Sequence, residues 1–426
     1  MKVTHTLNLK GLTRPLRGHH KAPDRPGERT GHGKRVLGEQ WRGRSSWPAR
    51  AAAASEGTAT AADAEQASPL QAFLAWLVAN GVQGIGSEGT PIGIWQGEDE
   101  QRGILCVSDI PKGQVIMRVP LRLALVDHED DLEAKAALYA EAPWSVRLAA
   151  KLLRELAKGH ESPWAAYLQV LPAVVDGPLT TFAWGDFKEI QYDPMMEQVH
   201  AGSWLLSDAY PRLEGEAIGG ATREQFEWAM SVVHSRTFGS AAEEGGVGVR
   251  MLLPLVDMLN HGGDETAFLL QDPSRPADNV EWELVSPQKS PSEEWEMVVS
   301  AKRDIQEGEE VLLSYGERSN DDFFLHYGFV PARNAHDDVI LFASLEEALD
   351  WHTEVFPHEG SGQGEYEAAL QAGRAAAPEV DGAAAKLPSS QAKQVQAVKL
   401  VAGNRLDVRL MAAYNHLAEA EGPTRK

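Results

Sequence analysis

Apolar residues recur at helical spacing along several parts of the chain. Between residues 70 and 77 they stand every three or four positions, which predicts an amphipathic helix that ends at Asn80-Gly81. The stretch 145–156 has the same period, and Thr222 stands as an N-cap before another such stretch. Helices are also predicted over 195–206, 222–233, 345–356, 366–375 and 390–418, and residues 121–235 are mostly helical.

Strands are predicted on both sides of that helical segment. The stretches 103–107 and 115–120 flank a turn at Pro111-Lys112-Gly113, and we expect them to form a hairpin. Two further stretches, 280–285 and 296–300, alternate as in an antiparallel sheet. Cys106 falls within the first of these strands and is interpreted as a buried strand residue.

Two apolar runs each end in side chains that can form hydrogen bonds. The run that begins at Leu252 delivers Asp257, Asn260 and His261 at its polar end. The second run delivers Tyr315, and a short helix capped by Ser319 or Asn320 then delivers Tyr327. Polar groups held in this way at the rim of a core indicate a binding site.

Together these two segments resemble the SET-domain protein-lysine methyltransferases. Among them, the branch typified by the Rubisco large-subunit methyltransferase carries an Asn-His pair, a strand that ends in Tyr and a Ser-Asn helix that ends in Tyr-Gly-Phe, in the order found here. The resemblance implies an α+β fold with SET-domain β-sheets and a pseudoknot. It also implies a SET domain over 69–335, a helical insert at about 121–235, and a short C-terminal helical domain over 336–426 that binds the protein substrate.

The resemblance also implies a cofactor, S-adenosyl-L-methionine, and roles for individual residues. Tyr315 matches the catalytic tyrosine. The residues matched to cofactor binding are Gly103, Ile104, Arg236, Asn260, His261 and Tyr315, and those matched to substrate binding are Arg236, Phe238, Asp257 and Tyr327. The sequence departs from the family pattern at Leu105, where a second glycine is expected, and at Ser240, where a further arginine is expected.

Tyrosines suit this chemistry for a physical reason. A lysine ammonium has no lone pair, and removing its proton at pH 7 costs roughly 4.6 kcal/mol. A dry site beside a positive sulfonium lowers that cost, whereas a carboxylate in contact with the amine would raise it. Tyrosine faces attract a sulfonium, and tyrosine hydroxyls orient a neutral amine.

Each of these residues also has a simpler structural interpretation. Tyr315 would be an aromatic residue at the rim of the core with a satisfied hydroxyl, and Tyr327 would pack its helix onto the core. Asn260 and His261 would form a turn, Asp257 a cap, and Arg236 a surface salt bridge.

Composition excludes several classes of protein. One cysteine among 426 residues allows neither a disulfide framework nor a cysteine-cluster zinc site, and no ligand set for a metal accompanies His261. The chain has no run of about 18 apolar residues, so no membrane span is predicted. Residues 1–54 hold 12 of the 40 basic residues but only 3 of the 62 acidic ones, which leaves a strongly acidic remainder. Such a surface repels nucleic acid and anionic membranes, so we expect neither as a partner.

The basic segment 1–68 shows no periodic pattern and is interpreted as a disordered transit peptide with a linker. The chloroplast stroma is therefore the expected location, with the mitochondrion or the cytosol as alternatives; a basic tail without an address or a nucleic-acid-binding arm are the other interpretations of this segment. The expected protein substrate is the Rubisco large subunit or another stromal enzyme such as fructose-bisphosphate aldolase. The alternatives are methylation of a histidine and a non-catalytic binding protein.

Overall fold

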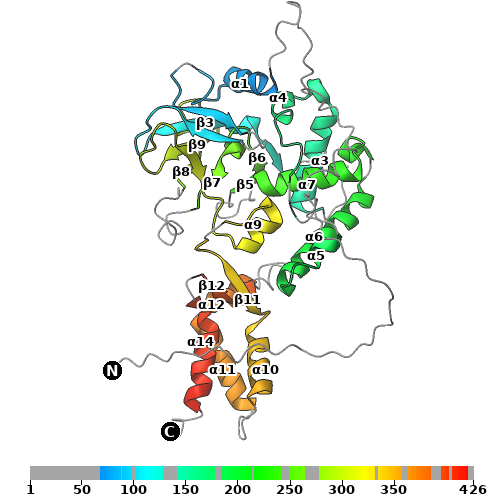
Figure 1. Cartoon of the computed structure of the whole chain (residues 1–426), viewed down its shortest axis with the longest axis vertical. Coiled ribbons are helices and arrows are strands. Elements are labelled where there is room, and N and C mark those ends of the chain that lie inside the picture. The colour runs from blue at the N-terminus through cyan, green and yellow to red at the C-terminus, as the bar shows by residue number, and fades with distance from the viewer. Residues whose placement is uncertain are drawn as a thin grey trace, which may run out of the picture. The chain divides into compact units, whose positions relative to one another are not determined.

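The structure is a computed structural model of the chain (Figure 1). The predicted transit peptide and linker lie outside the described residues, apart from Ser68. The structure describes residues 68–87, 89–97, 102–127, 142–175, 177, 184–213, 215–240, 249–263, 278–331, 334–356, 363–384, 395–402 and 405–420.

A seven-stranded sheet forms the centre of the fold. Its strands are antiparallel neighbours except at β10, which runs parallel to both β7 and β8. Figure 1 shows β3 and β9 side by side at one edge, where the register pairs Met117 with Val299. The strands follow the order β1 (Ile92–Gln96), β2 (Arg102–Cys106), β10 (Glu310–Leu313), β8 (Val280–Val285), β9 (Glu296–Ala301) and β3 (Val115–Pro120), with β7 (Asn260–His261) also paired to β10.

The predicted hairpin between the first two strands is wrong, although both strands exist. β2 pairs with β1 and with β10, whereas β3 pairs with β9. The true hairpin partner, β1, lies in the glycine-rich segment before residue 97 and was not predicted. Alternation of side chains identifies a strand but not its neighbour, because the partner is chosen by long-range packing.

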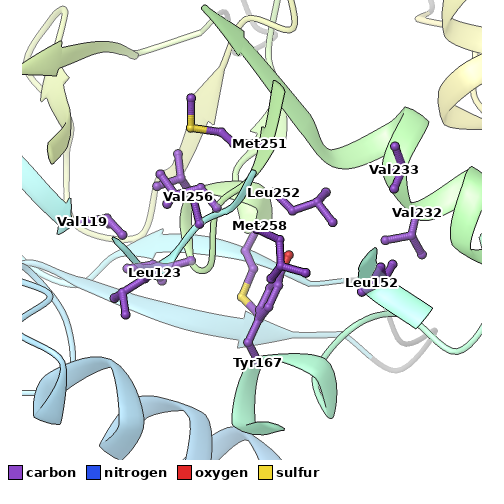
Figure 2. Close-up of a cluster of buried hydrophobic side chains, with 14 of the residues drawn as sticks. Val119, Leu123, Leu152, Tyr167, Val232, Val233, Met251, Leu252, Val256 and Met258 are labelled. Atoms are coloured by element: carbon purple, nitrogen blue, oxygen red, sulfur yellow. The ribbon is translucent and has the colours of Figure 1, made fainter. Parts of the chain in front are cut away.

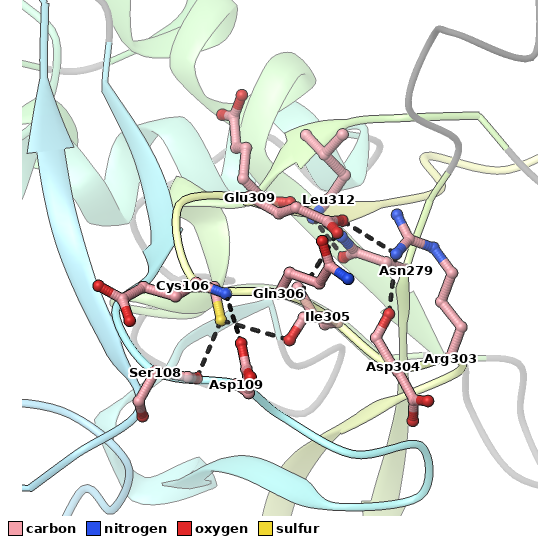
Figure 3. Close-up of polar contacts among 12 residues, drawn as sticks. Cys106, Ser108, Asp109, Asn279, Arg303, Asp304, Ile305, Gln306, Glu309 and Leu312 are labelled. Carbon is pink, nitrogen blue, oxygen red and sulfur yellow. Dashed lines mark hydrogen bonds and ion pairs between the residues drawn. The ribbon is translucent and has the colours of Figure 1, made fainter.

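Asn279 holds β10 in the sheet. It is fully buried just before β8, and its side-chain oxygen accepts a hydrogen bond from the Leu312 amide at 2.8 Å. Its side-chain nitrogen donates to the Glu310 carbonyl, also at 2.8 Å, and its own amide donates to the Leu312 carbonyl at 2.9 Å. Asn279 therefore supplies hydrogen-bond partners for the buried backbone groups of the short strand β10 (Figure 3).

Cys106 is fully buried in β2, as predicted. Its thiol donates to the Ser108 carbonyl at 3.1 Å (Figure 3), and burial raises the pKa of the thiol. A thiol that stays protonated is a weak nucleophile, so Cys106 acts as a packing residue.

Helices and a small sheet surround the central sheet. Two of the helices begin with capping boxes, at Ser68 with Gln71 and at the predicted cap Thr222 with Gln225. The small sheet has the order β4 (Leu125–Asp127), β6 (Val249–Leu252) and β5 (Thr237–Ser240). The helices are α1 (Pro69–Ala79), α3 (Trp144–Ala157), α4 (Ala165–Leu168), α5 (Trp184–Phe187), α6 (Asp193–Arg212), α7 (Arg223–Arg236) and α9 (Asn320–Tyr327), with 3-10 turns η1 (Leu121–Leu123), η2 (Gly159–Glu161), η3 (Gly215–Ile218) and η4 (Val256–Met258).

One buried cluster joins these elements (Figure 2). Leu152 of α3 and Val232 of α7 come from the apolar faces of their helices, and Leu252 comes from the end of β6. Met258 of η4 and Tyr167 of α4 complete it, and Tyr167 is fully buried. The cluster holds η4 against α3, α4 and α7. It thereby also positions the polar end of the apolar run that begins at Leu252.

The C-terminal residues form a second hydrophobic core, in which Val398, from a sheet that the sequence analysis did not predict, packs among helix residues. The predicted helix over 390–418 is wrong at Val398–Val401, which forms a strand of that sheet; two of its four residues are valine, a β-branched residue that favours strands. None of the helices that the structure describes is long and apolar enough to span a lipid bilayer. The elements are β11 (Asp338–Phe342), α10 (Leu345–Val355), α11 (Gln363–Ala376), α12 (Pro378–Ala384), β12 (Val398–Val401), β13 (Arg405–Leu406) and α14 (Val408–Ala420).

Candidate active site

The parallel pairing of β7 with β10 brings the two predicted segments together. Asn260 lies opposite Leu312, and His261 lies opposite Leu313. Tyr315 follows two residues after the end of β10, so it lies beside the Asn260-His261 pair although more than 50 residues separate them in the chain. This proximity is the geometry that the resemblance required of Asn260 and Tyr315.

Tyr315 is held by hydrogen bonds at its side-chain hydroxyl and at its backbone amide. Its hydroxyl donates to the Leu259 carbonyl at 2.8 Å, and its amide donates to His261 Nδ1 at 3.1 Å. Its ring stacks on the ring of Tyr327, with centroids 4.9 Å apart and planes 26° apart. The two predicted tyrosines therefore form one aromatic pair next to His261.

α9 positions Tyr327 through its two ends. Ser319 caps the helix by accepting a hydrogen bond from the Asp322 amide at 3.2 Å, which selects Ser319 from the two predicted caps. Gly328 ends the helix with φ of 75°, a conformation that glycine adopts without strain. The Arg318 guanidinium lies over the Tyr327 ring, 5.5 Å from its centroid, so Tyr327 contacts both an aromatic ring and a cation.

Both tyrosines stay protonated at neutral pH. Burial raises the pKa of Tyr315 well above its ordinary value, and burial also raises the pKa of Tyr327. Arg236 acts in the opposite direction on Tyr315, whereas Asp257 and Glu310 add to the effect of burial. Tyr315 is therefore a neutral phenol that forms hydrogen bonds, and it does not serve as a phenolate base.

Asp257 is the centre of a buried polar cluster. It is 7% exposed, its Oδ2 accepts a hydrogen bond from the Tyr167 hydroxyl at 2.8 Å, and Arg236 donates to its carbonyl at 2.7 Å. The same guanidinium lies 3.4 Å from Oδ2 as an ion pair, while Oδ1 is buried without a hydrogen-bond partner. Burial raises the pKa of Asp257, and Arg236 opposes that shift. Asp257 is therefore a buried ion-pair partner and not a helix cap.

A strained residue sets the position of Asp257. Leu255 has φ of 74° and is fully buried immediately before η4. A non-glycine residue in this region costs about 1–3 kcal/mol, which the surrounding core must offset. The strain allows the chain to turn sharply after Pro254 and deliver Asp257 to Arg236.

Three polar side-chain atoms lie close against Gly103, in the place where another residue would carry its Cβ. A Cβ at this position would collide with Glu310 Oε1, and would lie 2.6 Å from Trp95 Nε1 and 2.8 Å from Asn260 Nδ2. Asn260 Nδ2 donates to the Arg102 carbonyl at 2.9 Å and to Glu310 Oε1 at 2.7 Å, so both its protons are used. Trp95 Nε1 is buried and has no hydrogen-bond partner. Glycine is needed here for space, since a side chain would displace these groups.

Two predicted site residues, Ile104 and Phe238, make packing contacts. Ile104 is fully buried in β2, between Ile94 of β1 and Val311 of β10. Phe238 lies in β5 and packs edge-on against Trp282, with ring centroids 5.8 Å apart. Its predicted contact with substrate stays a prediction.

Four residues of this region were missed by sequence reasoning. Tyr167, Trp95, Glu310 and Arg318 each contact or point toward a predicted residue. Glu310 stands just before the apolar run that ends at Tyr315, which is the one available signal. Among the residues that the structure describes, no group of three His, Cys, Asp or Glu side chains is arranged to hold a metal ion.

A buried histidine pair joins the two helices that carry Arg236 and Tyr327. His234 of α7 stacks on His326 of α9 with centroids 5.1 Å apart, and Trp144 meets His234 edge-on at 5.6 Å. Burial lowers the pKa of His234 to about 3, with a contribution from His326, and lowers the pKa of His326 to about 4, with a contribution from Arg318. Both imidazoles are therefore neutral in the folded protein.

We expect this pair to make the fold acid-sensitive. Unfolded histidines titrate near pH 6.5, so below that pH the unfolded state binds more protons and stability falls as pH falls toward 4. Between pH 7.5 and 5.5 each histidine should cost about 1.4 kcal/mol of unfolding free energy, measured by urea denaturation. His326→Phe should remove about half of this pH dependence. The exposed His160→Asn is the control, and an equal pH dependence in wild type and His326→Phe would contradict the assignment.

Comparison with known proteins identifies the family. The family model described as the SET domain matches residues 101–316. The chain is 26% identical over 299 residues to the chloroplastic ribulose-1,5 bisphosphate carboxylase/oxygenase large subunit N-methyltransferase of Nicotiana tabacum, covering 67% of this chain and 56% of that protein. It is also 28% identical over 260 residues to the actin-histidine N-methyltransferase of Danio rerio, covering 57% of this chain and 39% of that protein. The chain thus spans about half the length of the curated relatives it matches.

Solved structures agree on the fold. The SET domain of LSMT bound to lysine and AdoHcy superposes with a TM-score of 0.55 at 18% identity, covering 83% of this chain and 71% of that chain. This likeness confirms the predicted α+β class and SET-domain sheets. Because the SET-domain model spans half of the sequence, the chain belongs to the SET-domain family.

Proposed function

We propose that this protein is an S-adenosylmethionine-dependent methyltransferase that modifies a lysine of a protein substrate. The observation that carries the proposal is the stacked pair Tyr315–Tyr327 beside Asn260 and His261, reached from segments far apart in the chain. A neutral phenol fixed to a backbone carbonyl is the group that a neutral amine needs for alignment.

The site fits the cofactor on two features of the structure. Gly103 has no side chain, so polar atoms of Glu310, Trp95 and Asn260 gather beside its backbone, and Trp95 Nε1 is a buried donor without an acceptor. The amino-acid end of S-adenosylmethionine carries both an acceptor and a donor that match such groups. When bound, the cofactor supplies a methyl group on a positively charged sulfur.

Residues of this chain would prepare the amine. The Tyr315 O–H is committed to the Leu259 carbonyl, so its oxygen lone pairs are left to accept an N–H of the incoming amine. The stacked Tyr315 and Tyr327 rings would border one side of the amine and exclude water there, which disfavours the ammonium form. The Asp257 carboxylate is engaged by Arg236 and Tyr167, an arrangement that keeps it from holding the substrate as an ammonium.

The relatives support a class of substrate. A relative named as a chloroplastic Rubisco large-subunit methyltransferase and the basic segment before residue 55 both support a plastid enzyme. The Rubisco large subunit or another stromal protein is then the proposed target, and the chain would act as the Rubisco methyltransferase-like branch does. The C-terminal residues 336–426 are the proposed docking domain for that protein.

Histidine methylation is the second candidate, because several relatives are named as actin-histidine methyltransferases. The pH dependence separates the two. A lysine target, with an ordinary pKa of about 10.4, should give a kcat/KM that keeps rising from pH 7 to 9, whereas a histidine target, near 6.5, should level off. Mass spectrometry of the labelled protein identifies the residue directly.

Calorimetry with S-adenosylmethionine tests the proposal before any substrate is known. Wild type should bind saturably, and Asn260→Ala should weaken binding by about tenfold or more, since a charge-assisted hydrogen bond contributes about 1.5–3 kcal/mol. Incubation with labelled cofactor and stromal extract should then label a protein. A wild-type chain that gives no binding heat would support a non-catalytic binding protein and reject the methyltransferase.

A further inference from the structure

The space beside Gly103 holds a charge that no predicted role uses. Glu310 Oε1 lies against Gly103 and accepts a hydrogen bond from Asn260 Nδ2 at 2.7 Å. Because Asn260 donates its other N–H proton to the Arg102 carbonyl, the side-chain amide is fixed in one orientation. Its oxygen is left to accept from a ligand.

Trp95 contributes a complementary group to the same space. Its indole N–H points to within 2.6 Å of the place where a Cβ of residue 103 would lie, and it is buried without an acceptor. An unpaired buried donor is costly, so a ligand that brings an acceptor gains from meeting it. One side of the space thus offers a donor and the other side a carboxylate.

Asp257, the other carboxylate near Tyr315, has a charged partner. Arg236 and Asp257 form an ion pair at 3.4 Å, with the carboxylate almost fully buried. Glu310 Oε1, by contrast, is bound by a neutral amide. The same carboxylate acts electrostatically on Tyr315, so it lies close enough to influence a charge placed beside that phenol.

The geometry points to Glu310 and Trp95 as two further cofactor-binding residues, with Glu310 selecting the sulfonium cofactor over its product, which lacks the sulfonium charge. This inference rests on the proposed function. Trp95 donates to the cofactor's carboxylate, which S-adenosylmethionine and S-adenosylhomocysteine share. Glu310 attracts the ammonium group, which both ligands also share, and the sulfonium, which only S-adenosylmethionine carries at the end of a short methylene chain. The anion therefore helps the site to release the product after the charge has left with the methyl group.

Titration calorimetry with the two ligands on the full chain tests this. In Glu310→Gln the ratio of the S-adenosylhomocysteine Kd to the S-adenosylmethionine Kd should fall about fivefold or more, since the charge is lost while the shape is kept. Trp95→Phe should weaken both ligands by a similar factor and leave the ratio unchanged. Glu309→Gln is the matched control, because Glu309 is the adjacent carboxylate and pairs with Arg303 at 2.9 Å instead.

The outcomes are distinct. Equal weakening of both ligands in Glu310→Gln, or no change, overturns the selection by charge. Thermal melting verifies that each variant is folded. If Glu310→Gln does not fold, Glu310→Asp takes its place, and this charged variant must keep the wild-type ratio of the two Kd values. A lowered ratio in Glu310→Asp overturns the inference. A wild type that binds neither ligand rejects the proposed function itself, whereas a wild type that binds both while Glu310→Gln keeps the ratio rejects only this inference.

Discussion

Tyr315→Phe should lower kcat by about 10²–10³-fold while leaving the Kd for S-adenosylmethionine within about threefold of wild type. The substitution removes one oxygen atom and keeps the ring that stacks on Tyr327. In the proposed reaction the lost oxygen orients the amine lone pair, so we expect the loss to fall on the chemical step. Single-turnover methylation and calorimetry on the same sample measure the two quantities.

Tyr210→Phe is a matched control for this variant. Tyr210 also donates its hydroxyl to a backbone carbonyl, that of Ala221 at 3.2 Å, but it belongs to α6 and packs against Phe226 of α7. Loss of one such hydrogen bond should cost about 1 kcal/mol of stability and no turnover. A Tyr315→Phe enzyme that binds cofactor and turns over at the wild-type rate would remove Tyr315 from the catalytic role.

Local patterns in the sequence single out candidate site residues but not their arrangement. Asn260, His261, Tyr315 and Tyr327 each stand at the end of an apolar run or a capped helix, and these are local patterns. The parallel pairing of Asn260 with Leu312 joins segments about 50 residues apart, and no periodic pattern encodes it. It depends on a buried β10 whose hydrogen bonds come partly from one side chain, that of Asn279.

The residues that the sequence analysis missed make contacts with positions far away in the chain. The hydrogen bond from Tyr167 to Asp257 spans 90 positions, and that from Asn260 to Glu310 spans 50. Tyr167 belongs to a four-residue helix, too short for an amphipathic period to identify. Asp257 was found by resemblance and assigned a possible cap, because only tertiary structure reveals that Arg236 and a buried phenol converge on it.

Asp257→Ala should therefore be the most destabilising single change at the site. It leaves the fully buried Tyr167 hydroxyl without an acceptor and the Arg236 guanidinium, only 22% exposed, without its carboxylate. Removing one partner of a buried ion pair costs about 3–5 kcal/mol, because the remaining charge stays buried. Urea denaturation at pH 7.5 should show this loss as a lower midpoint with an unchanged slope.

A double-mutant cycle with Tyr167→Phe separates the pairing from mere loss of volume. Tyr167→Phe alone should cost about 1–2 kcal/mol, since it removes one hydrogen bond and leaves one carboxylate oxygen unpaired. The double variant should cost less than the two single changes together, because with both partners gone no orphaned hydroxyl remains. Strict additivity, or a loss below about 1 kcal/mol in Asp257→Ala, would contradict the cluster.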